Sequence, residues 1–171
     1  MSFEYEKDLI YLAVVPYVLN SEGGYSNNIH DLGGPTNRGI AWNYNKEILL
    51  AMGVTDVKNL TKEQALQIYY VKYWQASLSN TIPDKRLAYM HFDAAVNQGV
   101  GFSLNALKKL SKNPANFEGN GKNEALWLRL LLEYLDIRLK AYNRDRNRKT
   151  FLEGWINRLI SLIDQDLKMG I

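Results

Sequence analysis

The helical sequence is interrupted near its start by the stretch Glu22-Gly-Gly-Tyr-Ser-Asn-Asn-Ile-His-Asp-Leu-Gly-Gly-Pro-Thr-Asn-Arg-Gly-Ile40. Five glycines and a proline stand there among short polar residues, a composition that favours turns and a small β-hairpin over helix. We therefore expect an irregular or hairpin segment over residues 23–41.

Apolar residues recur at helical spacing on both sides of this stretch. Ile10, Val14 and Val18 predict one helix over residues 4–20. Capping boxes predict two more helix starts, Thr61 with Gln64 and Thr150 with Glu153. Pro83 is expected in the first turn of a third helix. With these starts, the helices predicted after the irregular stretch cover residues 45–52 (closed by Gly53), 61 to about 74, 83–99, 103–111, 123–142 and 150–170.

Composition is that of a globular protein. The 171 residues include 46% hydrophobic residues and no cysteine, so one sizeable core without disulfides is expected. The apolar run 9–19 is too short to span a bilayer and is preceded by acidic residues. We expect a mainly α, monomeric globule without stable membrane insertion.

Charge is uneven along the chain. Residues 1–95 carry 8 Lys and Arg against 10 Asp and Glu, whereas residues 96–171 carry 13 against 8. The basic excess is concentrated in residues 138–149. Such a stretch either attracts an anionic partner or forms a solvated helix end and loop, and both interpretations stay open.

The chemistry of the chain is expected in the irregular stretch. Cleavage of a glycosidic bond needs an acid for the leaving oxygen and a second group that directs water or stabilises positive charge. Glu22 and Asp31 are the acidic residues of the stretch, and Thr36 adds a hydroxyl that can hold the attacking water. Burial against Tyr25 or Trp42 would keep Glu22 protonated, while Asp31 in a polar turn would stay ionised.

At these residues the sequence resembles glycoside hydrolase family 108, the N-acetylmuramidases found among phage endolysins and bacterial wall-remodelling enzymes. The resemblance is carried by Glu22-Gly-Gly-Tyr25 and by Asp31-Leu-Gly-Gly-Pro-Thr-Asn-Arg-Gly-Ile40. Tyr73-Trp74 and Phe92-Asp-Ala-Ala-Val-Asn-Gln-Gly99 are similar to later family blocks. Phe151-Leu-Glu-Gly-Trp-Ile-Asn-Arg158 resembles a peptidoglycan-associated segment.

The resemblance implies a lysozyme-like helical fold and hydrolysis of the β-1,4 bond from N-acetylmuramic acid to N-acetylglucosamine in bacterial peptidoglycan. Glu22 takes the role of the essential acid, and Asp31 and Thr36 take the water-positioning roles of phage-type lysozymes. Within one compact unit over residues 1–171, residues 1–100 are expected to form the catalytic part. Residues 101–171 are expected to form a helical part packed on it.

Substrate contacts are predicted at Tyr25, at Tyr73 and Trp74, and at Asp93 and Asn97. The aromatic pair can stack on sugar rings or belong to the core. The polar pair lies four residues apart on one helix face, where it can bond sugar hydroxyls or form a bond within itself.

Other chemistries are not indicated. Gly34 to Gly39 lacks the Lys and hydroxyl residue of a phosphate loop, and His30 and His91 lack partners at metal-ligand spacing. We expect neither metal nor cofactor, no nucleic-acid partner, and a structural or groove-lining role for both histidines.

Alternatives remain at this stage. A lytic transglycosylase needs only one Glu, and a non-catalytic wall-binding module or a basic nucleic-acid binder needs none. Whether hydrolysis retains or inverts configuration depends on the carboxylate separation, which sequence does not provide. Because no signal peptide is visible, we expect synthesis in the bacterial cytoplasm and holin-type or other export to the wall.

Overall fold

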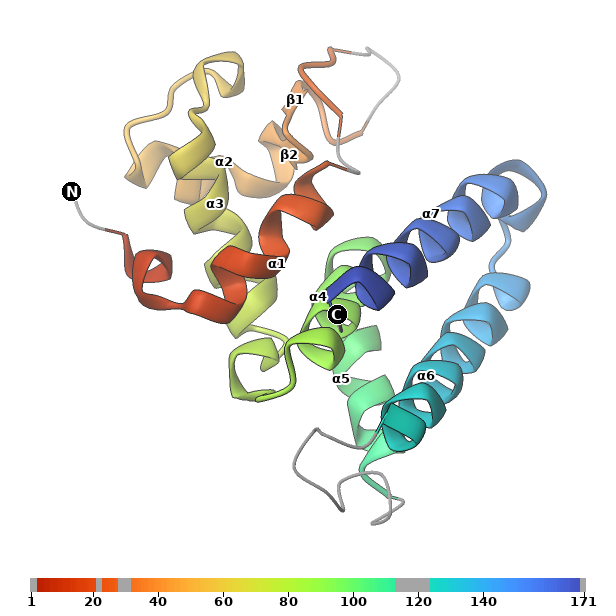
Figure 1. Ribbon diagram of the computed structural model, residues 1–171. Helices are drawn as coiled ribbons and strands as arrows, with labels where there is room; N and C mark the ends of the chain where they lie inside the picture. Colours follow the sequence, from red (N-terminus) through yellow and green to blue (C-terminus); the bar gives the residue numbers. More distant parts are fainter. Residues whose placement is uncertain (1–2, 21–22, 28–31, 113–123, 170–171) are drawn as a thin grey trace. The chain divides into compact units, whose positions relative to one another are not determined.

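The computed structural model describes residues 3–20, 23–27, 32–112 and 124–169. The chain divides into two compact units, Met1–Gln75 and Ala76–Ile171 (Figure 1). Helices dominate both units, and a two-strand antiparallel hairpin lies in the first. The predicted lysozyme-like, mainly α fold with a hairpin inside residues 23–41 is confirmed. The packing of residues 1–171 as one unit, and their division after residue 100, stay predictions.

The first unit begins with a helix that is broken at Asp8. This residue caps α1 by accepting a hydrogen bond from the Tyr11 backbone N–H at 3.0 Å, so the helix predicted over residues 4–20 is two elements. The described elements of this unit are η1 Glu4–Lys7, α1 Leu9–Leu19, β1 Thr36–Asn37, β2 Ile40–Ala41, α2 Trp42–Ala51, η2 Val57–Asn59, α3 Lys62–Tyr69 and the π-helical η3 Tyr70–Gln75.

Two helix ends of this unit follow the predicted chemistry. The predicted capping box is present, because Thr61 accepts from the Gln64 N–H at 3.2 Å and Gln64 accepts from the Thr61 N–H at 3.0 Å. Gly53 closes α2 with a φ of +75°, and the Val54 N–H donates to the Leu49 carbonyl at 2.9 Å, as in a Schellman motif. The start of α2 differs, since it begins three residues earlier than predicted. The helix predicted to about residue 74 ends as an α-helix at Tyr69 and continues as the π-helical η3.

The core of the first unit is built on aromatic contacts between α1 and η3. The ring of Tyr11 lies 5.5 Å from that of Trp74 and 5.0 Å from that of Tyr70. The Tyr11 hydroxyl donates to the Leu66 carbonyl at 2.6 Å. Burial raises the pKa of Tyr11, which stays a neutral hydrogen-bond donor.

The second unit contains η4 Ser79–Thr81, α4 Lys85–Gln98, α5 Val100–Leu110, α6 Glu124–Arg144 and α7 Arg148–Met169. Three predicted starts are wrong here. Helix α5 begins at Val100, three residues before the predicted start at residue 103. Asp84 caps α4 by accepting from the Leu87 N–H at 2.9 Å, so Pro83 precedes the helix. The predicted box at Thr150 lies inside α7, which begins at Arg148.

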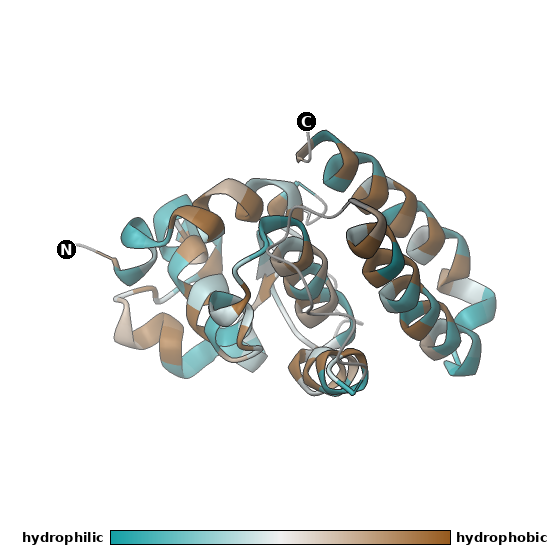
Figure 2. Cartoon of the chain, turned by 60° about the horizontal axis from the view of Figure 1, so that its bottom comes forward, coloured by the Kyte–Doolittle hydropathy of each residue, from teal (hydrophilic) through white to brown (hydrophobic). Residues whose placement is uncertain are grey.

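Helix α4 is the centre of the second unit. It packs against α5, α6 and α7, and its ten residues from 86 to 95 are all buried. Helices α6 and α7 run side by side in opposite directions, each with hydrophobic and hydrophilic bands along its length (Figure 2). Within the described residues, every helix is too short or too polar to cross a lipid bilayer.

Candidate functional site

The hairpin that follows Gly33 and Gly34 is the ordered part of the stretch expected to carry the chemistry. Thr36 pairs with Ala41 and Asn37 with Ile40. The two-residue turn between them has positive φ at both Arg38 (+52°) and Gly39 (+74°), as a type I′ turn requires. Ile40 is fully buried and anchors the second strand in the core.

A tight loop precedes the hairpin and is fastened to the start of α2. Gly34 has a φ of +68°, and a Cβ at this position would lie 3.0 Å from Asn43 Nδ2. The Trp42 N–H donates to the Pro35 carbonyl at 2.9 Å, and the Asn43 N–H donates to the Gly33 carbonyl at 3.0 Å. Gly34 is therefore required by backbone conformation and by close approach.

The hairpin is also tethered to the rest of the first unit. Asn37 Nδ2 donates to the carbonyls of Val57 at 3.0 Å and Lys58 at 3.2 Å. The Tyr69 hydroxyl donates to the Arg38 carbonyl at 3.1 Å. These bonds to η2 and α3 give the strands a rigid support, which a catalytic constellation needs.

Thr36 is the one predicted catalytic residue that the structure describes. Its backbone forms a two-bond bridge with Ser26, with both N···O distances at 2.8 Å. Its side chain is half-buried, and Oγ1 donates its hydrogen to the Gly34 carbonyl at 3.1 Å. Because a hydroxyl has one hydrogen, the free lone pair of Oγ1 can only accept, for example from a water molecule.

Tyr25 lies next to this bridge with an accessible ring. Its side chain is 46% exposed, and Lys58 Nζ lies 5.9 Å from the ring centroid. An exposed aromatic face beside a cation is suited to contact a sugar ring. Glu22 and Asp31, the other predicted catalytic residues, and His30 lie outside the described residues.

Trp74 and Tyr73, the predicted aromatic substrate contacts, differ in accessibility. Trp74 has no exposed surface, and its indole N–H donates to Asp8 Oδ2 at 2.8 Å, so its place is structural and it offers no face to a sugar. Tyr73 is half-buried, and its ring centroid lies 5.4 Å from that of Tyr69. Tyr73 therefore keeps partial access.

Asp93 and Asn97 belong to a buried ionic cluster in the second unit. Asp93 is 2% exposed and pairs with Arg138 at 2.8 Å and with Arg158 at 2.9 Å. Asn97 Oδ1 accepts from the Tyr142 hydroxyl. Both polar side chains thus connect helices, and Asp93 has almost no surface left for a sugar hydroxyl.

His91 is a second buried polar group of the same unit. Its ring nitrogens lie 2.8 Å from the Tyr134 hydroxyl and 2.8 Å from the Ser77 carbonyl oxygen. Burial lowers the pKa of His91, against a smaller opposite effect of the bond to Ser77. The imidazole has a structural role, one of the two roles predicted for it.

With this geometry in place, the chain can be compared with known proteins. Residues 15–99 match the family Glycosyl hydrolase 108. The chain belongs to glycoside hydrolase family 108.

A solved structure is similar to this chain over most of its length. The structure of SagA from Brucella abortus is 25% identical in sequence, covers 92% of this chain and 94% of its own, and superimposes with a TM-score of 0.68. None of the curated proteins matches the chain. Family membership makes the protein a glycoside hydrolase.

The family 108 match contains both blocks of the irregular stretch. Within the second block, the structure gives a physical reason for Gly34 and Gly39, which have positive φ, and for Ile40, which is buried. In Thr36 the polar group is the hydroxyl, which donates to the Gly34 carbonyl and can accept another hydrogen bond. Among the described residues, no group of three or more His, Asp or Glu side chains could hold a metal ion.

Sequence reasoning did not single out Arg138 and Arg158 as partners of Asp93. A signal for Arg138 exists, since it stands four residues from both Tyr134 and Tyr142 on the apolar face of α6. Burial alone would lower the pKa of Arg138, but Asp93 and Tyr142 outweigh it and the net shift is upward. Arg138 is therefore a buried, permanently charged residue.

Proposed function

We propose that this family 108 protein is an N-acetylmuramidase that hydrolyses the β-1,4 bond from N-acetylmuramic acid to N-acetylglucosamine in peptidoglycan. The observation that carries the proposal is the family match over residues 15–99, which includes Glu22-Gly-Gly-Tyr25 and Asp31 to Ile40. Glu22 is the proposed general acid, and Asp31 and Thr36 are the proposed water-positioning residues.

Glu22 protonates the glycosidic oxygen as the bond to the anomeric carbon breaks. Without that proton the departing sugar would leave as an alkoxide, which is a poor leaving group, so general-acid catalysis contributes about 10²- to 10⁴-fold to the rate. The positive charge that develops on the sugar is met by the carboxylate of Asp31 or by the water that it directs.

The geometry of Thr36 supports its part in the proposal. Since Oγ1 donates to the Gly34 carbonyl, a water at Thr36 must donate one hydrogen to Oγ1. Donation of the second hydrogen to a carboxylate leaves a water lone pair free for attack on the anomeric carbon. Tethers at Asn37 and Arg38, the two residues after Thr36, hold the hairpin that carries this hydroxyl.

Tyr25 is the proposed stacking surface for a sugar ring, because its face is accessible beside the Ser26 to Thr36 bridge. Tyr73 is a weaker candidate for the same role. Trp74 and Asp93 are assigned to the structure of the two units, for the burial given above.

Delivery to the wall completes the proposal. We infer synthesis in the bacterial cytoplasm followed by holin-type or other export, because the substrate lies outside the membrane. Detection of the protein in culture medium only when an export system is co-expressed would support this inference. Its appearance there without such a system would contradict it.

The deciding experiment compares Glu22→Gln with wild type in a turbidity assay on purified cell walls. The amide cannot donate a comparable proton, so we expect a loss of at least about 100-fold with an unchanged circular dichroism spectrum. Glu47→Gln is the matched control, an exposed Glu on α2, and should clear walls at the wild-type rate. A wild-type rate in the Glu22 variant would refute the assignment of Glu22 as the acid, and an absence of clearing by the wild-type protein would favour a non-catalytic wall binder.

Mass analysis of the released fragments separates hydrolysis from the transglycosylase alternative. A hydrolase adds one water to each cleaved bond, whereas a lytic transglycosylase lets a sugar hydroxyl attack and releases an anhydro product. We expect the hydrated product only. Anhydro ends in the wild-type digest would refute the muramidase proposal and identify a lytic transglycosylase.

A further inference from the structure

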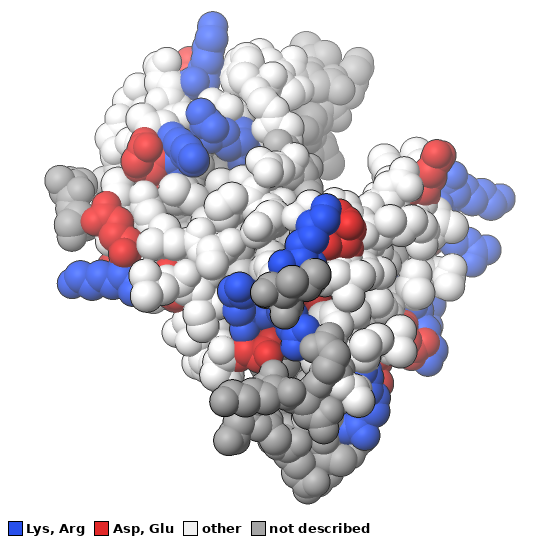
Figure 3. All heavy atoms as spheres, viewed as in Figure 1, with Lys and Arg blue, Asp and Glu red and all other residues white. Residues whose placement is uncertain are grey.

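Basic side chains gather on two neighbouring helices of the second unit. A pocket of about 720 Å³ lies between α5 and α6. Its lining includes five cationic side chains, all exposed: Lys108, Lys109, Lys112, Lys140 and Arg144. In the view of Figure 3, Lys and Arg side chains follow α6 and its turn into α7, with few acidic side chains between them. We call the pocket the basic groove.

The basic groove keeps most of its positive charge. Asp136 is its one acidic lining residue and pairs with Lys140 at 2.6 Å. That pair offsets one positive charge, so the lining keeps a net formal charge of +4, from five cations less one carboxylate. The remaining cations repel one another, and an anion in the groove would relieve that repulsion.

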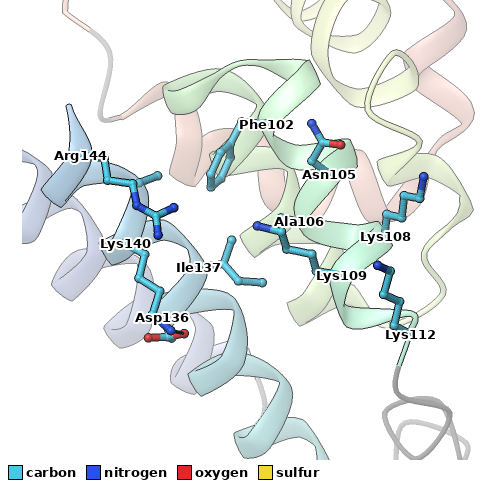
Figure 4. Close-up of a pocket in the computed structure, with 11 residues that line it drawn as sticks. Phe102, Asn105, Ala106, Lys108, Lys109, Lys112, Asp136, Ile137, Lys140 and Arg144 are labelled. Carbon is cyan, nitrogen blue, oxygen red and sulfur yellow. Dashed lines mark hydrogen bonds and ion pairs between the residues drawn. The ribbon is translucent and has the colours of Figure 1, made fainter. Parts of the chain in front are cut away.

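The two walls of the groove can hold a ligand between them. Figure 4 shows Lys109 of α5 and Arg144 of α6 extending into the space between the helices, with Phe102 and Ile137 between these two cations in the view. Lys108 points away from this space in the same view. The floor is thus apolar and half-buried, and the charges stand along its edges.

This shape favours a flexible chain over a flat or a stacked partner. A membrane surface cannot enter a groove between two helices. Single-stranded nucleic acid is held by successive stacking on aromatic faces, and Phe102 is the one aromatic side chain in the described lining. An extended polymer with an acidic group at each repeat and short carbon segments between them fits both the charged edges and the apolar floor.

The composition of the groove favours phosphate over carboxylate as that acidic group. Four of its five cations are lysines, whose ammonium groups act as point charges and are common phosphate ligands. Arginine, whose planar guanidinium binds carboxylates and phosphates through two parallel bonds, occurs once in the described lining, as Arg144. We propose that the basic groove between α5 and α6 binds an anionic phosphodiester polymer of the bacterial cell wall, separately from glycan cleavage.

The test is a binding measurement with full-length protein and fluorescent poly(glycerol phosphate), followed by co-sedimentation with two wall preparations. One preparation keeps its phosphodiester polymers, and the other has lost them by hydrofluoric acid treatment. Wild type should bind the polymer, with an affinity that falls steeply as salt is raised. It should also sediment more with the untreated walls.

The groove variant is Lys109→Ala with Arg144→Ala, one cation from each wall. Its matched control is Lys85→Ala with Lys168→Ala, which removes the same charge from exposed positions of the same unit outside the groove lining. We expect about tenfold or greater loss of polymer affinity in the groove variant, and less than twofold in the control.

Four results would overturn the proposal. Equal losses in both variants would mean a general charge effect, and no loss in either would remove the groove as the site. Equal sedimentation with both wall preparations would mean that the groove binds carboxylates of the wall and not its phosphodiesters. Tighter binding to an oligonucleotide or to anionic vesicles than to poly(glycerol phosphate) would identify another class of partner.

Hydrolysis of the acid-treated walls keeps this proposal apart from the muramidase proposal. The groove variant should digest those walls at the wild-type rate, since they lack the proposed groove ligand. If no protein digests them while polymer binding behaves as expected, the proposed activity fails and the groove assignment stands. If the acid-treated walls are digested normally but polymer binding does not depend on the groove, the proposed activity stands and the groove assignment fails.

Discussion

The buried cluster around Asp93 makes a quantitative prediction for Asp93→Ala. Asp93 stands between Arg138, which has no exposed surface, and Arg158, at distances of 2.8 and 2.9 Å. Removal of the carboxylate leaves the Arg138 charge buried beside neutral partners such as Gln98 Oε1 at 2.7 Å and the Tyr142 hydroxyl at 3.2 Å. Breaking such a pair from one side costs about 3–5 kcal/mol of unfolding free energy.

This cost is measurable by urea unfolding followed by circular dichroism. With a urea dependence of about 2 kcal/mol per molar, the midpoint should fall by about 1.5–2.5 M. The milder Asp93→Asn variant keeps a polar group of the same shape. It remains measurable if the alanine variant does not fold, and it should lie between that variant and wild type.

Asp136→Ala is the matched control, because Asp136 forms an ion pair with Lys140 that is as short, at 2.6 Å, but exposed. We expect a loss of no more than about 0.5 kcal/mol there. A midpoint change in Asp93→Ala no larger than in Asp136→Ala would refute the reasoning from burial. Folded Asp93→Asn should also clear walls at the wild-type rate, and a selective loss of activity would instead restore Asp93 as a substrate contact.

Two further pairs of variants test local conformation. Thr61→Ala removes the capping hydroxyl of α3 and should lower the unfolding free energy by about 1 kcal/mol. Thr150→Ala lies inside α7 and should be close to neutral. Equal losses in thermal melts of the two variants would contradict the helix start at residue 148. Gly34→Ala should lower the unfolding free energy in urea by more than Gly53→Ala. Both glycines have positive φ, but only a Cβ at Gly34 would lie 3.0 Å from Asn43 Nδ2. Equal losses in the two variants would show that this contact is unimportant.

Local chemistry explains which parts of the fold could be predicted. The capping box at Thr61, the glycine closure of α2 and the turn at Gly39 each depend on groups within six residues of one another, so the sequence contains the whole interaction. The capping box predicted at Thr150 was wrong because the helix starts at residue 148, which makes Thr150 an interior position.

The proposed site was predictable only in part. Glu22, Asp31 and Thr36 came from a pattern with few alternatives, and for Thr36 the structure adds a donor bond to Gly34 that leaves the hydroxyl as an acceptor. Trp74 and Asp93 were harder, because sequence shows that an aromatic or acidic residue is present but not which side of its helix faces the interior.

The sequence by itself determined the mainly helical class, the position of the hairpin and the family blocks, because helical periodicity, glycine conformation and short motifs are local properties. Only the tertiary structure decided that Asp93 lies between Arg138 and Arg158, and that cations of α5 and α6 line one groove. Those residues are separated by tens of positions, and their meeting depends on how helices pack, a property that no local pattern contains.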